Sequence, residues 1–231
     1  MSRPSAPTRE NSGVLSALEQ RALHWLAPRV PRRIGPDHLT ALGFGGAVVA
    51  LFGYWLASRH PLALWLVNVG LVINWLGDSL DGSIARLRGA ERPRYGFFLD
   101  QSIDVISQAL FALGLAISGY ILPEIVAAGF AAYLMMTVQS LLRAQTSGIF
   151  ALATGGMGLT EVRCLFIVAN IAFFVIPPRP LAIASVTLTY ADACGIVWIV
   201  VNLALYLSVM VRESKTLAAQ ESVDRDGDRS K

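Results

Sequence analysis

The sequence predicts an all-α membrane protein with six transmembrane helices, preceded by an amphipathic helix at the membrane interface. The first observation is composition, because 54% of the 231 residues are hydrophobic and only 15% are charged, with a mean hydropathy of +0.53. A soluble domain is less apolar than this. The second observation is a series of apolar runs long enough to cross a bilayer core of roughly 30 Å. Short breaks at proline or glycine separate most of them.

The composition divides the chain into four parts. Residues 1–12 are polar and contain prolines, so we expect a disordered tail there. Residues 13–34 are expected to form the interfacial helix and a basic linker, and residues 35–212 the six-helix transmembrane domain. Residues 213–231 are charged and poor in aromatic side chains, which predicts a second disordered tail.

The amphipathic segment follows the first tail. One face of a helix here would be apolar and the other polar. The apolar face consists of Val14, Leu15, Leu18, Ala22, Trp25 and Leu26, and the polar face of Ser16, Gln20 and His24. The segment is too short and too polar to span a membrane, but it suits a helix that lies in the interface. An amphipathic linker without membrane contact is the alternative.

Six apolar segments make up the transmembrane domain. They cover residues 39–57, 62–76 with an extension to 86, 97–122, 125–142, 162–176 and 190–211. Residues 181–189 are apolar as well, and they either extend the sixth helix or form a short segment on the outer side.

Basic residues set the expected orientation. Six spans place Arg59 and Arg179 on one side and the remaining members of the 19 lysines and arginines on the other. Cytoplasmic loops carry the excess of such residues, and no apolar signal segment follows Met1. We therefore expect both termini in the cytoplasm of a bacterial-type inner membrane. The same distribution explains the pI of about 9.1 without nucleic-acid binding.

Four aspartates stand out between the second and third spans. Asp78 and Asp81 are three residues apart, and Asp100 and Asp104 are four apart, so each pair shares a helix face. A carboxylate at membrane depth costs about 2.5–3.5 kcal/mol on insertion scales and usually marks function. Four of them together require a positively charged partner.

Divalent metal ions are the expected partner. Arg86 is the one nearby arginine on the same face, which leaves an excess of negative charge. Mg²⁺ or Mn²⁺, two ions in number, would reverse that excess and let a diphosphate bind, since both ions prefer hard oxygen ligands. Asn74, one turn before Asp78, either supports the metal ligands or is a satisfied buried amide. The alternative partners for the acids are the loop residues Arg88, Arg92 and Arg94.

The stretch from residue 78 to 104 resembles the signature of the CDP-alcohol phosphotransferases, which are membrane enzymes. That signature reads D-x-x-D-G-x-x-A-R, then a spacer, then G-x-x-x-D-x-x-x-D. Its fixed positions are all present: Asp78, Asp81, Gly82, Ala85, Arg86, Gly96, Asp100 and Asp104. The spacer 87–95 has nine residues where the family usually has eight. One extra loop residue changes closure entropy little, so it bears on the loop path and not on the chemistry.

The resemblance implies a reaction in which a CDP-activated substrate gives its phosphoryl-linked half to an alcohol and CMP leaves by direct displacement. It implies that Asp78, Asp81 and Asp100 hold metal and that Asp104 is the general base and also touches metal. It further implies a homodimer, and contacts between the CDP moiety and a set of small or basic residues. These are Gly82, Ala85, Arg86 and Gly96.

Two further groups of residues are candidates for substrate contact. Pro36 to Thr40 resembles the family's P-x-x-x-T entry to the first span, which places Asp37 and Thr40 near the nucleotide; either residue could instead cap the helix. The second group would face the polar head of the acceptor and consists of Gln139, Arg143, Glu161 and Arg163. For Glu161 the alternative is a role at the helix start, favoured by the helix dipole, with Thr160 as N-cap.

Two other kinds of protein also place acids in a membrane. An intramembrane prenyltransferase binds magnesium diphosphate through Asp-rich motifs, although these usually lie far apart in the sequence. A divalent-cation transporter would not need Gly82, Ala85 and Arg86 in register. The expected partners are a CDP-linked lipid or alcohol, a small polar or lipid alcohol as acceptor, and membrane lipids. The sequence does not choose among inositol, inositol phosphate, glycerol phosphate, serine, choline and ethanolamine as acceptors.

Overall fold

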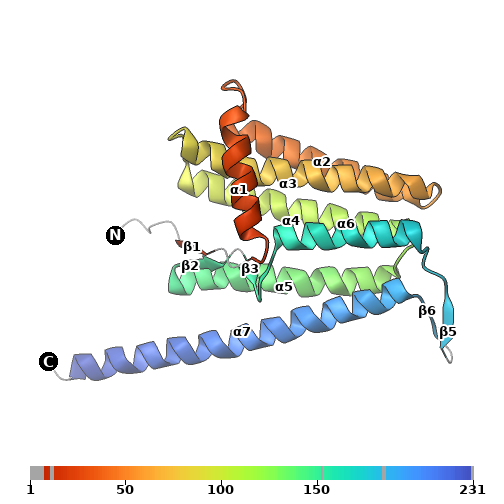
Figure 1. Ribbon diagram of the computed structural model, residues 1–231. Coiled ribbons are helices and arrows are strands. Elements are labelled where there is room, and N and C mark those ends of the chain that lie inside the picture. Colours follow the sequence, from red (N-terminus) through yellow and green to blue (C-terminus); the bar gives the residue numbers. More distant parts are fainter. Residues whose placement is uncertain (1–7, 11–12, 152, 184–185, 230–231) are drawn as a thin grey trace.

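The computed structural model describes residues 8–10, 13–151, 153–183 and 186–229. Long helices lie side by side along one direction, and helix α1 crosses them near one end (Figure 1). The helices are α1 (Ser16–Leu26), α2 (Pro36–Ala57), α3 (Leu64–Leu87), α4 (Pro93–Ser118), α5 (Pro123–Ser147), α6 (Leu159–Val175) and α7 (Tyr190–Arg229). Short 3₁₀ turns, η1 (Ala27–Arg29) and η2 (Pro61–Ala63), precede α2 and α3.

Six short strands occupy the connections. They are β1 (Thr8–Glu10), β2 (Ile149–Ala151), β3 (Ala153–Thr154), β4 (Met157–Gly158), β5 (Leu181–Ile183) and β6 (Val186–Leu188). β1 pairs with β2 in parallel, whereas β3 pairs with β4 and β5 with β6 in antiparallel hairpins. The apolar segment 181–189 therefore forms mainly a hairpin before α7 and does not extend the helix.

Proline and glycine mark the helix ends. Pro36, Pro93 and Pro123 are the first residues of α2, α4 and α5, where the missing N–H has no helical partner to lose. Gly119 and Gly148 follow α4 and α5 with φ of 77° and 69°. This left-handed conformation ends a helix and is easily adopted by glycine.

The protein is an all-α membrane protein, but the number of spans differs from the prediction. Among the described residues, five helical segments are long and apolar enough to cross a membrane: Pro36–Ala57, Pro61–Leu87, Pro93–Ser118, Pro123–Ser147 and Tyr190–Ser222. The expected span at residues 162–176 corresponds to α6, which has 17 residues. At about 1.5 Å per residue such a helix falls short of a bilayer core of roughly 30 Å.

The C-terminal part also departs from the expected disorder. α7 has 40 residues and continues as a helix to Arg229, through most of the segment 213–231. The segment contains two residues each of Ala, Glu, Lys and Arg, which favour helices, and no proline, so the helix of the last span can propagate. At the other end, β1 lies in the expected tail; residues 1–7 and 11–12 of that tail lie outside the described residues.

α2 and α3 pack with their backbones in close contact. A Cβ added at Gly46 would lie 2.6 Å from the carbonyl oxygen of Gly70, and one at Gly77 would collide with the backbone of Leu39 and Gly43. Small residues at such positions let membrane helices approach closely. This packing fixes the part of α3 that carries Asp78 against α2.

A buried polar chain ties α6 to the same pair of helices. The Tyr54 hydroxyl on α2 donates to Asn170 Oδ1 on α6 at 2.9 Å, and Asn170 Nδ2 donates to Asn68 Oδ1 on α3 at 2.9 Å. Buried polar groups need such partners where water is excluded. α6 is therefore held to α2 and α3 deep in the bundle as well as at its N-terminus.

α1 lies across one end of the bundle (Figure 1). Leu23 and Leu26 pack against a small buried cluster that includes Leu80 and Ile84 of α3. Of the residues expected to face the membrane, three are exposed, with Val14 at 79%, Leu18 at 62% and Trp25 at 60% of their surface. The others are partly buried, and Leu26 contacts the bundle instead. One face of α1 therefore contacts the bundle while apolar side chains point away from it.

Candidate active site

Three of the four aspartates come together at one end of the bundle. Asp78 on α3, and Asp100 and Asp104 on α4, each offer an oxygen atom, and these oxygens lie within 4.8 Å of one another. The loop between α3 and α4 reverses the chain, which brings the two aspartate pairs to the same end. All three side chains are partly buried. The donor set consists of hard oxygen ligands, so it fits a divalent cation such as Mg²⁺ or Mn²⁺.

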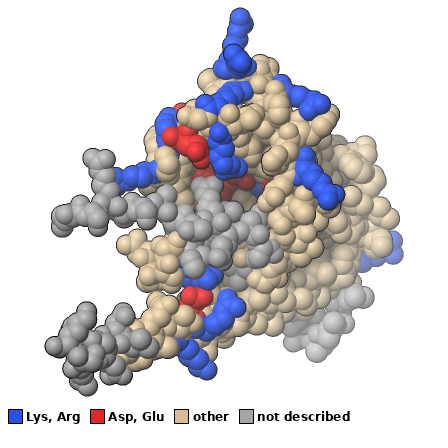
Figure 2. All heavy atoms as spheres, turned by 60° about the vertical axis from the view of Figure 1, so that its left-hand side comes forward, with Lys and Arg blue, Asp and Glu red and all other residues tan. Residues whose placement is uncertain are grey.

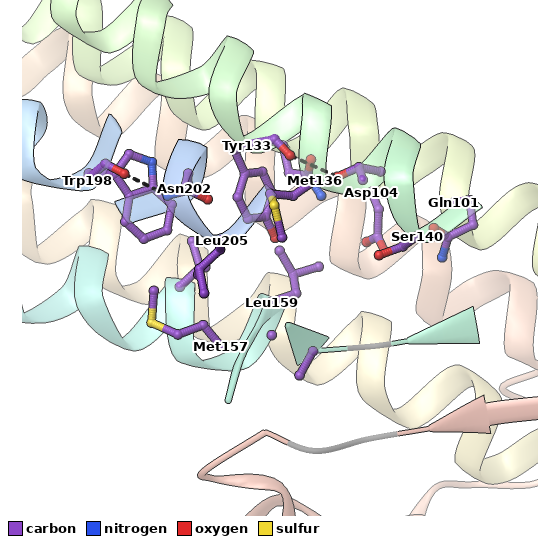
Figure 3. Close-up of a pocket in the computed structure, with 15 residues that line it drawn as sticks. Gln101, Asp104, Tyr133, Met136, Ser140, Met157, Leu159, Trp198, Asn202 and Leu205 are labelled. Atoms are coloured by element: carbon purple, nitrogen blue, oxygen red, sulfur yellow. Dashed lines mark hydrogen bonds between the residues drawn. The ribbon is translucent and has the colours of Figure 1, made fainter. Parts of the chain in front are cut away.

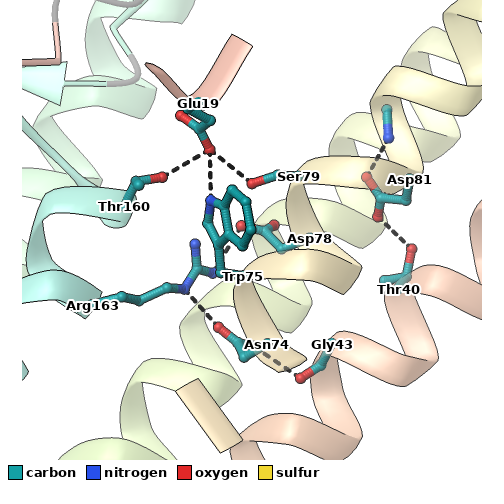
Figure 4. A network of polar contacts seen from close by, with 11 residues as sticks. Glu19, Thr40, Gly43, Asn74, Trp75, Asp78, Ser79, Asp81, Thr160 and Arg163 are labelled. Carbon is teal, nitrogen blue, oxygen red and sulfur yellow. Dashed lines mark hydrogen bonds and ion pairs between the residues drawn. The ribbon is translucent and has the colours of Figure 1, made fainter. Parts of the chain in front are cut away.

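Asp81 lies apart from this carboxylate cluster of Asp78, Asp100 and Asp104. Its Oδ2 accepts a 2.6 Å hydrogen bond from the hydroxyl of Thr40 on α2, and its Oδ1 accepts one from the N–H of Gly82. Figure 4 shows the hydrogen bond between Asp81 on α3 and Thr40 on α2. Thr40, expected near the nucleotide, thus contacts the motif directly.

Arg163 is a cation that contacts the carboxylate cluster through Asp78. It lies in the first turns of α6 and donates from Nη2 to Asp78 Oδ2 at 2.8 Å. Its Nε donates to Asn74 Oδ1 at 2.7 Å, and Asn74 Nδ2 in turn donates to the Gly43 carbonyl at 2.9 Å (Figure 4). Only 3% of Arg163 is exposed, so the ion pair is shielded from water and strongly oriented.

Sequence reasoning placed Arg163 at the acceptor and named Arg86 as the local cation. A signal for the role of Arg163 does exist, because an arginine in the first turns of an apolar helix on the acidic side needs a counter-ion. Arg86 itself is exposed, and its Nη2 lies 3.4 Å from the hydroxyl of Ser83.

Within the motif, a Cβ added at Gly82 would lie 3.3 Å from Arg86 Nη1, whereas one at Gly96 would meet nothing within 4 Å.

Two loop arginines bind groups other than the carboxylate cluster. Arg88 donates to the backbone carbonyls of Ile34 at 2.5 Å and Val30 at 2.8 Å. Arg92 forms an ion pair with Asp37. Arg88 therefore fixes the linker before α2, and Asp37, another expected nucleotide ligand, is paired on the surface. The alternative in which loop arginines neutralise the aspartates of the motif is therefore wrong for Arg88 and Arg92.

The remaining acceptor candidates are bound elsewhere. Gln139 Nε2 donates to the Tyr206 carbonyl at 3.1 Å, and Arg143 pairs with Glu213 at 3.0 Å, so both connect α5 to α7.

Glu161 accepts hydrogen bonds from the backbone N–H groups of Gly158 at 2.9 Å and Leu15 at 2.8 Å. α6 begins after Gly158, so Thr160 is not its N-cap.

A cavity of about 110 Å³, named the polar cavity after its end at Asp104, lies beside that residue. α4, α5, α6 and α7 contribute to its wall, with polar groups from Gln101, Gln108, Thr137 and Ser140 among mainly apolar side chains. Figure 3 shows Asp104, Gln101 and Ser140 toward one end of it and Trp198 and Asn202 toward the other. Sequence reasoning did not identify this lining, because it combines residues from four distant segments.

An apolar cavity of about 420 Å³ lies deeper in the bundle. Its wall includes Phe111, Leu115, Phe166 and Trp198, and it shares Tyr133 with the polar cavity. The carboxylates therefore border a small cavity with some polar groups, and this cavity shares part of its wall with a larger apolar one. This order suits a substrate with a charged head and a hydrocarbon tail.

Comparison with known proteins adds independent information. The model of the CDP-alcohol phosphatidyltransferase family matches residues 33–210. An archaetidylinositol phosphate synthase from Aeropyrum pernix is 32% identical over 196 residues, which cover 82% of this chain and 93% of that protein. One from Pyrococcus horikoshii is 32% identical over 88 residues, which cover 38% of this chain and 44% of that protein.

Proposed function

The chain belongs to the CDP-alcohol phosphatidyltransferase family, and from this membership we propose that it transfers the phosphoryl-linked half of a CDP-activated lipid to inositol phosphate, with release of CMP. The enzyme class, a CDP-alcohol phosphotransferase, follows from the family. Membership of this family excludes the two alternatives considered from the sequence, an intramembrane prenyltransferase and a divalent-cation transporter. The choice of acceptor is supported by the relative from Aeropyrum pernix, whose name specifies an inositol phosphate lipid and which aligns over 93% of its length.

The position of Asp104 carries the proposal. Asp104 belongs to the carboxylate cluster and also lines the polar cavity. An alcohol in that cavity would have its hydroxyl next to a carboxylate that can take the proton. The diphosphate of the CDP-linked substrate would lie on the other side, at Asp78 and Asp100.

The proposed chemistry is a direct displacement at phosphorus. Asp104 accepts the proton of the acceptor hydroxyl while the hydroxyl oxygen forms a bond to the lipid-bearing phosphorus. The bond from that phosphorus to the bridging oxygen breaks, and CMP leaves with the electron pair. Phosphoryl transfer of this kind depends mainly on positioning and charge neutralisation. Two Mg²⁺ or Mn²⁺ ions held by the aspartates would neutralise the diphosphate when bound.

The ligands of the CDP moiety are proposed from the motif. Gly82, Ala85, Arg86 and Gly96 lie along the helices that carry the aspartates, and Thr40 joins them through Asp81. Asp81 is proposed as a further metal ligand, as the motif implies, because a carboxylate oxygen that accepts a hydrogen bond keeps a second lone pair. Arg163, expected at the acceptor, is instead proposed to orient Asp78. The bonds of Gln139, Arg143 and Glu161 make these three weaker candidates for the acceptor site.

The proposed orientation places this end of the bundle in the cytoplasm. Figure 2 shows lysine and arginine side chains distributed over the face that contains this end, with acidic side chains recessed among them. Such an excess of basic residues is typical of the cytoplasmic side. A lipid substrate would enter from the membrane and a soluble acceptor from the cytosol. A homodimer, which the family resemblance implies, is part of the same proposal.

An acceptor panel tests the proposed substrate. Purified protein is supplied with Mn²⁺ and CDP-diacylglycerol, and CMP is measured with inositol phosphate, inositol, glycerol phosphate or serine as acceptor. We expect CMP release with inositol phosphate and little with the others. Faster release with glycerol phosphate or serine would contradict the assignment of the acceptor while leaving the reaction class intact.

A further inference from the structure

Glu19 on α1 connects three helices through one oxygen atom. Its Oε1 accepts hydrogen bonds from Trp75 Nε1 at 3.0 Å, Ser79 Oγ at 2.8 Å and Thr160 Oγ1 at 2.9 Å. Trp75 and Ser79 lie on α3, and Thr160 lies in the first turn of α6. Figure 4 shows the three donors converging on the Glu19 carboxylate. Hydrogen bonds to an ionised acceptor are about twice as strong as neutral ones.

The donors lie next to the residues of the ion pair in the active site. Ser79 follows Asp78 directly, and Thr160 precedes Arg163 by three residues, about one helical turn. The bridge through Glu19 therefore joins the same two helices, α3 and α6, that Arg163 joins through its 2.8 Å contact with Asp78. The two connections lie side by side (Figure 4).

α1 has other contacts that keep Glu19 in place. The backbone N–H of Leu15 donates to Glu161 at 2.8 Å, and Glu161 also accepts from Gly158 at the start of α6. One turn further along α1, Leu23 packs against the cluster around Ile84. α1 is thus fixed to both helices that it bridges.

We propose that Glu19 is a positioning residue, which holds the start of α6 against α3 so that Arg163 orients Asp78 for metal binding. The inference rests on the proposed function. Glu19 lies before residues 33–210, the part that the family model matches. The interfacial helix therefore contributes to the geometry of the active site in addition to any contact with the membrane.

This role predicts a specific kinetic effect. Removing the bridge would misplace Asp78 relative to Asp100 and Asp104, and a misplacement of about 1 Å can lower a rate roughly 10²-fold. The contacts between α2 and α3, including the Thr40–Asp81 hydrogen bond, do not involve Glu19. The rate constant should fall while the KM for the CDP-linked substrate changes little.

Glu19→Ala is the main variant, and Gln20→Ala on the exposed side of α1 is its matched control. At saturating Mn²⁺ we expect kcat for CMP release to fall about 10–10²-fold in Glu19→Ala, with KM for CDP-diacylglycerol within about threefold. Glu19→Gln keeps an acceptor oxygen and should recover most of the activity. A second readout is Mn²⁺ binding without substrate, followed by electron paramagnetic resonance. The half-saturating Mn²⁺ concentration should rise about tenfold in Glu19→Ala, the usual effect of losing a support for a metal ligand.

Two milder variants decide the question if Glu19→Ala does not fold. Thr160→Val and Trp75→Phe each remove one donor. Thr160→Val keeps the shape of the side chain and Trp75→Phe keeps an aromatic ring, and each should lower kcat about three- to tenfold with the protein folded. Unchanged kcat and Mn²⁺ binding in these variants, or equal values for Glu19→Ala and Gln20→Ala, would overturn the inference. Wild-type protein that releases no CMP would instead refute the proposed function.

Discussion

Asp81 and Asp104 belong to one motif but have different surroundings. Asp104 lies in the carboxylate cluster and lines the polar cavity, whereas Asp81 accepts a 2.6 Å hydrogen bond from Thr40. Their roles therefore need not be equal. In the proposed mechanism Asp104 acts on the acceptor, whereas Asp81 connects α3 with α2 near the proposed nucleotide site.

Replacement of Asp104 should separate chemistry from binding. In Asp104→Asn we expect the rate of CMP release to fall about 10²–10⁴-fold, the usual contribution of a general base. CDP binding should change much less, because Asp78 and Asp100 remain as ligands. The rate of CMP release tests the loss of chemistry, and the CDP-induced shift in melting temperature tests whether CDP still binds. Turnover close to wild type would remove Asp104 from this role.

Gly82 tests the position of the nucleotide. A Cβ at Gly82 would approach only the mobile end of Arg86, at 3.3 Å, so larger side chains should fold. We predict that Gly82→Leu inserts normally but loses most of the CDP-induced thermal shift in Mg²⁺, with Gly82→Ala intermediate. A full shift in Gly82→Leu would show that the nucleotide does not approach this part of α3.

At the scale of the helices, the close packing of α2 and α3 is open to a matched test. Gly77→Ala adds a methyl group that collides with the backbone of α2, whereas Gly45→Ala adds one with nothing within 4 Å. We expect Gly77→Ala to lower the stability by about 1–3 kcal/mol, as overpacking does. Gly45→Ala should be neutral or slightly stabilising, because alanine favours helices. Equal melting temperatures in detergent would contradict this account of the packing.

The sequence predicts most of the helices but not how they pair. Pro36, Pro93 and Pro123 define helix starts through local geometry, and apolar runs define five of the six expected spans. α6 was predicted as a span because its composition is apolar, although its 17 residues make it short. α7 was predicted to end before its charged tail, yet no proline stops it.

The residues of the candidate site are likewise predictable from local sequence only where they lie on one helix, and not where the contact joins two helices. The spacing of the aspartates places Asp100 and Asp104 on one helix face, and their proximity to Asp78 follows from the reversal between α3 and α4. The contact of Arg163 with Asp78 joins residues 85 positions apart. Glu19 and Thr160 are 141 apart. No periodic pattern encodes such pairs, since they depend on which helices become neighbours.

For the whole molecule, the distribution of basic residues predicts its orientation in the membrane. Cys164 and Cys194, both exposed, are first replaced by serine. Arg59→Cys should then react with an impermeant thiol reagent added outside intact cells, whereas Gly89→Cys should not. Permeabilised cells serve as the control in which both positions react. Reversed labelling would overturn the proposed topology and the cytoplasmic position of the active site.

The central claim is that the aspartates act through bound divalent metal in a transfer that releases CMP. The most direct measurement is CMP release by the purified protein before chelation, after exhaustive chelation, and after return of Mn²⁺ or Mg²⁺. Three carboxylates with oxygens within 4.8 Å repel a diphosphate unless cations intervene, so we predict complete loss and full recovery. CMP release that persists after chelation would contradict the account.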